Sequence, residues 1–135
     1  MVPPTRRDAA VVVRLAEIVV RDSELVVQLS ALEKLGALHA DVRVPLSHVV
    51  WARVVEHPWS VLRGWRCPGT GIPGVIMLGT RRGSFGADFA AVYKDRPAVA
   101  VELRDAGFRR LIVCVEDPAA VVQSLQTHPA VEPPG

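Results

Sequence analysis

The chain has 135 residues, a formal net charge of +2 and a hydrophobic content of 50%. This length fits one domain with a real core, and the small net charge argues against nucleic acid as a partner, because nucleic-acid-binding domains carry a basic face or stripe. The prolines near both ends predict flexible tails at residues 1–8 and 129–135, with a single domain at residues 9–128.

The most apolar stretch near the N-terminus, residues 9–20, is interrupted by Arg14 and Glu17. It is too short for a membrane span, which needs roughly 20 apolar residues, and its internal charges argue against a secretory signal. We therefore expect a cytoplasmic protein. In that compartment Cys67 and Cys114, which lack C-x-x-C spacing, are expected to be free thiols.

Valine-rich segments predict strands at the start of the domain, because β-branched side chains suit a pleated surface. Residues 11–20 are expected to form the first strand, and the polar residues 21–23 are typical of a turn. Residues 24–29 alternate between two faces, with leucine or valine at every second position on one of them. This alternation predicts a second, half-buried strand and therefore a hairpin.

A short helix is expected to follow this hairpin. Ser30 and Glu33 have the spacing of a capping box, in which each side chain binds the backbone N–H of the other residue. The intervening residues favour helix, and Gly36 is a plausible C-terminal cap. The side chains expected to face the core are Leu32, Leu35 and Leu38.

The rest of the chain is expected to consist of strands, one long loop and a final helix. Residues 59–73 contain repeated glycine and proline, which predicts the longest irregular segment of the domain. Asp117 suits a helix N-cap and Pro118 the first helical position, so a C-terminal helix is expected from there to about residue 126. The predicted strands are residues 40–44, 49–55, 75–78, 87–93, 98–103 and 108–115.

The order of these elements resembles the bacterial pleckstrin-homology-like (PH-like) domains that occur as small stand-alone proteins, notably in actinobacteria. The likeness is carried by residues 44–49, 66–71, 89–93 and 111–118 and covers most of the chain between residues 11 and 126. It implies a mostly β fold, a two-sheet, partly open barrel of about seven strands with a short helical insert and a capping C-terminal helix.

The resemblance implies little about function, because members of such a fold bind lipid headgroups, peptides or each other. Lipid-binding members use a basic loop between the first two strands. Here that turn is Arg21-Asp22-Ser23-Glu24, which has no net charge. This departure argues against phosphoinositide binding.

Several kinds of chemistry lack the residues they would need. Residues 69–74 match G-x-G-x-x-G, but a dinucleotide site requires a helix after this motif, and here a strand is expected. No motif ties a base to Ser60, Ser84 or Cys67, so we expect neither an enzyme nor a bound cofactor. The four histidines lack metal-ligand spacing, which argues against a metal site at His39, His48, His57 or His128.

The candidate interaction surface combines tryptophan with arginine, a composition typical of binding surfaces. Its alternative is structural, with the tryptophans packed over an open end of the barrel and the arginines solvated. The residues of this surface are Trp59, Arg63, Trp65, Arg66, Arg81 and Arg82.

Three functions follow from this reading of the sequence. The first is a non-catalytic binding or interaction module, with an unknown protein partner or with self-association through an exposed sheet edge. The second is a small-ligand-binding or enzymatic domain that uses the region from Trp59 to Arg82. The third, less favoured, is peripheral membrane binding through the same arginines and tryptophans.

Overall fold

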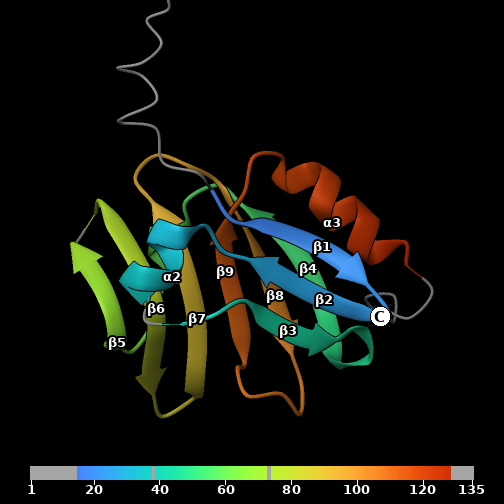
Figure 1. Ribbon diagram of the computed structural model, residues 1–135, viewed down its shortest axis with the longest axis horizontal. Coiled ribbons are helices and arrows are strands. Elements are labelled where there is room, and N and C mark those ends of the chain that lie inside the picture. Colours follow the sequence, from blue (N-terminus) through green and yellow to red (C-terminus); the bar gives the residue numbers. More distant parts are fainter. Residues whose placement is uncertain (1–14, 38, 73, 129–135) are drawn as a thin grey trace, which may run out of the picture.

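The computed structural model describes residues 15–37, 39–72 and 74–128, and for residues 66–68 it describes the backbone alone. The fold is mostly β, with two sheets and a C-terminal helix beside them (Figure 1). These features confirm the coarse prediction. The described residues form nine strands rather than about seven, and the two sheets do not close into a barrel. The predicted tails and Leu38 lie outside the described residues.

The small sheet has three antiparallel strands, β1 (Glu17–Arg21), β2 (Glu24–Gln28) and β3 (Val42–Pro45), in that order. The first strand was predicted over residues 11–20. Among the described residues it begins at Glu17, and residues 11–14 are not described. Asp22 and Ser23 both have positive φ, of 49° and 65°. Two such residues give the turn whose twist matches a two-residue hairpin, which confirms the turn at residues 21–23.

The large sheet has six strands in the order β4-β8-β9-β7-β6-β5. All neighbouring strands are antiparallel except β7 and β9, which run parallel. That parallel pair was not expected from a run of consecutive strands. The strands are β4 (Val49–Val55), β5 (Trp65–Ile72), β6 (Ile76–Gly83), β7 (Gly86–Tyr93), β8 (Ala98–Leu103) and β9 (Arg110–Cys114).

The prediction of one irregular segment over residues 59–73 was wrong for its second half. A 3-10 turn, η2 (Pro58–Val61), is followed by a short loop, and then β5 pairs with β6. Strand β5 lies at the edge of the sheet, where Pro68 needs no partner for a backbone N–H, and its register shifts between Arg66 and Gly69. The glycines and proline that indicated a loop instead mark an edge strand.

Helix α2 (Ala31–Ala37) forms where the capping box predicts it. Ser30 Oγ accepts from the N–H of Glu33 at 3.2 Å, and Glu33 Oε1 accepts from the N–H of Ser30 at 2.9 Å. The predicted core face was wrong, because Leu32 is 65% exposed and Leu35 is 71% exposed. The helix instead turns Glu33 inward, where Oε2 accepts a hydrogen bond from the Tyr93 hydroxyl at 2.7 Å.

Helix α3 (Pro118–Gln126) confirms the predicted C-terminal helix. Asp117 is its N-cap and accepts from the N–H of Ala120 at 3.2 Å. Val122 and Leu125 are buried, and the helix packs on β4 and β8. Its last residue, Gln126, donates from Nε2 to the Ala52 carbonyl at 2.9 Å, which joins the helix end to the large sheet.

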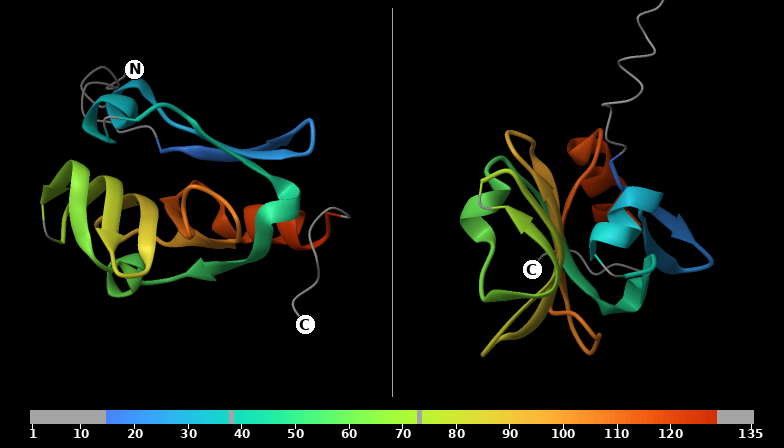
Figure 2. Two further views of the ribbon diagram at one scale, coloured as in Figure 1. Left: turned by 90° about the horizontal axis from the view of Figure 1, so that it is seen from below. Right: turned by 60° about the vertical axis from the view of Figure 1, so that its left-hand side comes forward.

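The large sheet is covered on both faces (Figure 2, right). We call the side that meets α2, α3 and the small sheet the layered face; on β7 it carries Phe89, Ala91 and Tyr93. The opposite side, the loop-covered face, carries Asp88, Ala90 and Val92 and lies beneath η2 and residues 62–64. Both sets of side chains are buried, so the sheet forms a core on either side.

A Trp59–Arg81 pocket on the loop-covered face

The loop that crosses the large sheet is fastened by a buried ion pair. Arg63 donates from Nε to Asp88 Oδ2 at 2.7 Å and from Nη2 to Asp88 Oδ1 at 2.9 Å. Asp88 is 1% exposed, and the guanidinium of Arg63 lies 3.9 Å from the centroid of the Phe85 ring. The hydrogen bond with Asp88 raises the pKa of Arg63, against an opposing effect of burial. Arg63 therefore holds the fold rather than presenting a free charge.

Arg81, on β6, fastens the same loop from the other side. It donates from Nε to the Arg63 carbonyl at 2.9 Å and from Nη2 to the Gly64 carbonyl at 2.6 Å. The close approach requires glycine at position 64, whose φ is +76° and where a Cβ would collide with the Arg82 carbonyl. The remaining nitrogen, Nη1, donates to the sulfur of Met77 at 3.7 Å and to no other atom of the described residues.

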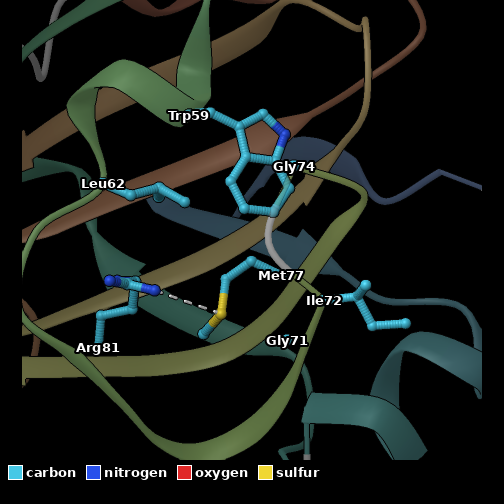
Figure 3. A pocket seen from close by; sticks show the side chains of 7 residues that line it. All are labelled: Trp59, Leu62, Gly71, Ile72, Gly74, Met77 and Arg81. Carbon is cyan, nitrogen blue, oxygen red and sulfur yellow. Dashed lines mark hydrogen bonds between the residues drawn. The ribbon is translucent and has the colours of Figure 1, made fainter.

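The fastened loop places Trp59 over β6 and creates a pocket of about 290 Å³ between η2 and the β5–β6 hairpin. The side chains of Trp59, Leu62, Met77 and Arg81 converge on it, and Ile72 points outward at its rim (Figure 3). The indole Nε1 of Trp59 is buried and has no hydrogen-bond acceptor among the described residues. We call this cavity the Trp59–Arg81 pocket; Gly71 and Gly74 complete its lining.

The predicted interaction surface is thus divided. Trp59 and Arg81 meet at the pocket, whereas Arg63 lies in the ion pair with Asp88. Trp65 and Arg82 are exposed and face each other in the register of β5 and β6. Arg66 is opposite Arg81 in the same register, and its side chain lies outside the described residues. Of the five predicted residues whose side chains are described, Trp59 and Arg81 line the pocket, and Arg63, Trp65 and Arg82 do not.

Three residues important to the site were missed from the sequence. Leu62 and Met77 line the pocket, and Asp88 holds the loop that covers it. Asp88 carried a usable signal, since it is the one acidic residue in the otherwise apolar or glycine-containing strand β7. A charge in such a strand indicates a buried partner. Leu62 and Met77 carried no such signal, because no pattern in the sequence predicts that η2 and the residue after it pack over β6.

A second pocket, of about 300 Å³, lies where the two sheets meet. It is lined by β3, the η1 turn (Leu46–His48) and the β8–β9 connection, and includes His39, His48 and Phe108. The rings of His39, Phe89 and Phe108 pack in tilted or edge-on arrangements at centroid distances of 5.4–5.7 Å. Of its two carboxylates, Asp41 and Asp105, the first accepts from the N–H of Leu29 at 2.9 Å. The Nδ1 atom of His48 is buried and has no hydrogen-bond partner among the described residues.

Of the two thiols, that of Cys114 is accounted for by packing. Cys114 is buried, and burial raises the pKa of its thiol, which makes the thiol unreactive near neutral pH. The side chain of Cys67 lies outside the described residues. Within residues 15–37, 39–72 and 74–128, no group of three or more histidine, cysteine or acidic side chains is placed to hold a metal ion.

Comparison of the chain with models of protein families, with curated proteins and with solved structures found no match. No helix among the described residues is long and apolar enough to cross a membrane. The site must therefore be interpreted from its own geometry.

Proposed function

We propose that this chain is a non-catalytic binding module on a PH-like scaffold, and that the Trp59–Arg81 pocket is its ligand site. The scaffold proposal is supported by the order of elements, by two sheets and by the C-terminal helix packed on β4 and β8. The ligand proposal is carried by one observation. A cation, Arg81, faces a cavity shared with apolar side chains, and among the described residues its Nη1 donates to a sulfur atom alone.

The lining of the pocket is suited to binding rather than to catalysis. Its polar side chains are the guanidinium of Arg81 and the indole of Trp59. Both offer hydrogen-bond donors and no acceptor, so neither supplies a general base. The volume of about 290 Å³ is at the lower end for small-molecule pockets. A small molecule that combines an acceptor with an apolar group suits this lining.

A nuclear magnetic resonance titration tests the proposed function. A set of small aromatic and aliphatic fragments is added to ¹⁵N- and methyl-labelled protein, and the Trp59 indole and Met77 methyl signals are followed. The expected result is saturable shifts at both for at least some fragments, with no change at Trp65, which lies 64% exposed at the far end of β5. If no fragment shifts Trp59 or Met77 in a saturable way, the proposed function is wrong.

A second candidate, self-association, is favoured by where exposed apolar side chains gather. The large hydrophobic residues exposed in the described chain all belong to α2, β5 or the β5–β6 turn. These elements adjoin, since Thr70 Oγ1 donates to the Gly36 carbonyl at 2.7 Å. Pro68 and the register shift interrupt the backbone edge of β5, so side chains would carry the contact. The residues are Leu32, Leu35, Trp65, Ile72 and Val75.

Light scattering over a dilution series tests this candidate, with a second copy of the chain as the occupant. If the apolar residues pair, the mass should rise with concentration, and Ile72→Glu should hold the protein as a monomer. Arg53→Glu, on β4 at the opposite edge of the sheet, is the matched control and should leave association unchanged. A mass that stays monomeric across the series excludes the candidate.

Peripheral membrane binding receives less support. Arg63 is paired with Asp88, and two nitrogens of Arg81 are bound to backbone carbonyls. Both cations would have to leave these partners to reach lipid phosphates. Sedimentation with anionic vesicles at low salt tests this function, and absence of binding there would exclude it.

A further inference from the structure

We infer that the ligand of the Trp59–Arg81 pocket is a small monocarboxylate with an apolar body. The inference rests on the proposed function and adds the chemical class of the molecule. In this arrangement the carboxylate replaces the Met77 sulfur as the acceptor of Arg81 Nη1, and the apolar body lies among Trp59, Leu62 and Met77. Three features of the pocket lead to this assignment.

The first feature is the charge of the pocket. Arg81 has no carboxylate partner among the described residues, and no acidic side chain lines the cavity. A thioether sulfur is a weak acceptor, so an arginine N–H directed at sulfur is poorly satisfied. Hydrogen bonds between ionised partners are roughly twice as strong as neutral ones. An anion therefore gains more here than any neutral ligand.

The second feature is the number of donors, which separates a carboxylate from a phosphate. The fork of Arg81 is largely occupied, since Nε and Nη2 bind the carbonyls of Arg63 and Gly64. This leaves Nη1 as the one guanidinium nitrogen directed at the cavity, and the indole of Trp59 is the other side-chain donor in the lining. Phosphate sites usually offer more donors, from arginine forks or clustered backbone N–H groups. One guanidinium nitrogen matches a single negative charge on a carboxylate oxygen.

The third feature is the apolar wall. The side chains of Trp59, Leu62 and Met77 face the cavity around Arg81, and flexible methionine adapts to ligands of different shape (Figure 3). An inorganic anion would leave this wall in water, whereas a phenyl or alkyl group would cover it at roughly 25 cal/mol per Å² of buried apolar surface. The ligand must therefore carry both a charge and an apolar group.

The test compares matched probes on the wild-type protein. Calorimetry and the Trp59 and Met77 signals follow 3-phenylpropionate, its neutral analogue 3-phenylpropionamide, and phenyl phosphate. We expect the carboxylate to bind about tenfold more tightly than the amide, a ratio that corresponds to about 1.4 kcal/mol. Its affinity should fall as salt is raised, because the charge pair is partly screened. Phenyl phosphate should bind no more tightly than the carboxylate.

Two variants separate the role of Arg81 in binding from its role in holding the loop. Met77→Leu keeps the volume but removes the competing sulfur, so the carboxylate should bind at least as tightly as to the wild type. Arg81→Met should abolish the difference between carboxylate and amide. If that variant does not fold, Met77→Leu carries the test of Arg81, and weaker carboxylate binding in it would overturn the assignment. Leu62→Ala, which tests the apolar lining, should weaken both probes alike while keeping their ratio.

The outcomes distinguish the two proposals. Equal affinity for carboxylate and amide, tighter binding of phenyl phosphate, or fragments that bind at Trp59 while the carboxylate does not, would each overturn the ligand class and leave the pocket as a binding site. If none of the fragments or probes shifts Trp59 and Met77, the proposed function fails and the ligand class fails with it.

Discussion

The two faces of the large sheet are stabilised by different means. On the layered face, Phe89 is fully buried beside Phe108 and His39, and the small sheet and two helices provide the cover. On the loop-covered face the strands carry smaller side chains, such as Ala90 and Ala100. A loop held by arginines covers this face. Both faces leave a cavity of similar volume, about 300 Å³ on the layered face and about 290 Å³ on the loop-covered face, so the two covers differ in what holds them rather than in the room they leave.

The largest expected effect on the loop-covered face comes from Arg63→Met. This change leaves the buried carboxylate of Asp88 without its partner, and breaking such a pair costs about 3–5 kcal/mol. Urea unfolding measures the loss. The matched control is Arg110→Met, whose 3.4 Å pair with Glu102 lies on the same face but is about one-fifth exposed on both sides, so it should cost less than half as much. Equal losses would show that the loop does not depend on Asp88.

On the layered face, the most sensitive polar contact is that of Glu33. Glu33→Ala leaves the Tyr93 hydroxyl and the Ser30 N–H without their acceptor, so we expect a loss of about 2–3 kcal/mol in the free energy of unfolding. Glu33→Gln keeps an oxygen and similar volume, and should lose roughly half as much. Thermal and urea unfolding measure both. A neutral outcome for Glu33→Ala would mean that α2 is held by other contacts.

The sequence predicted the layered face better than the loop-covered face. Alternating valines located most strands, and Asp117-Pro118 located α3, because both signals act over a few neighbouring residues. The pocket depends on residues far apart in the chain, with Arg63 meeting Asp88 and Trp59 meeting Met77. Local patterns carry no information on such pairs. They also could not separate an edge strand from a loop at Trp65–Ile72, since glycine and proline suit both.

Alkaline pH is expected to weaken the core by a smaller amount. Burial raises the pKa of the Cys114 thiol above its ordinary 9.0, and burial with the hydrogen bond to Glu33 raises the pKa of Tyr93 above its ordinary 10.0. Above these ordinary values the unfolded chain releases protons that the folded chain retains, so stability is full below pH 9 and falls as pH rises.

The loss attributable to Cys114 should be at most about 1.4 kcal/mol by pH 10, since each such proton contributes at most about 1.4 kcal/mol per pH unit. Urea unfolding at pH 8, 9 and 10 measures it. Cys114→Ala should reduce the slope between pH 9 and 10, and Tyr93→Phe should reduce it only above pH 10. An unchanged slope in Cys114→Ala would show that this thiol does not titrate differently on unfolding.

The smallest expected effect concerns the residues that periodicity placed in the core. Leu35→Ser should change the free energy of unfolding of the monomer by less than about 0.5 kcal/mol, because its side chain is largely exposed. Leu25→Ala, at a fully buried position of β2, should cost about 2–5 kcal/mol in the same measurement.

A helix as short as α2 completes about two turns, and a pair of leucines in it does not define a face. The buried side is defined instead by Gly36, which lets the helix approach Leu78, and by Glu33, which binds Tyr93. A large loss of stability in Leu35→Ser would show that Leu35 faces the core, as its spacing predicted, and would remove it from the exposed apolar surface. A negligible loss would show that Glu33, and not the leucines, forms the buried side of α2, and leaves the leucines available to contact a second copy of the chain.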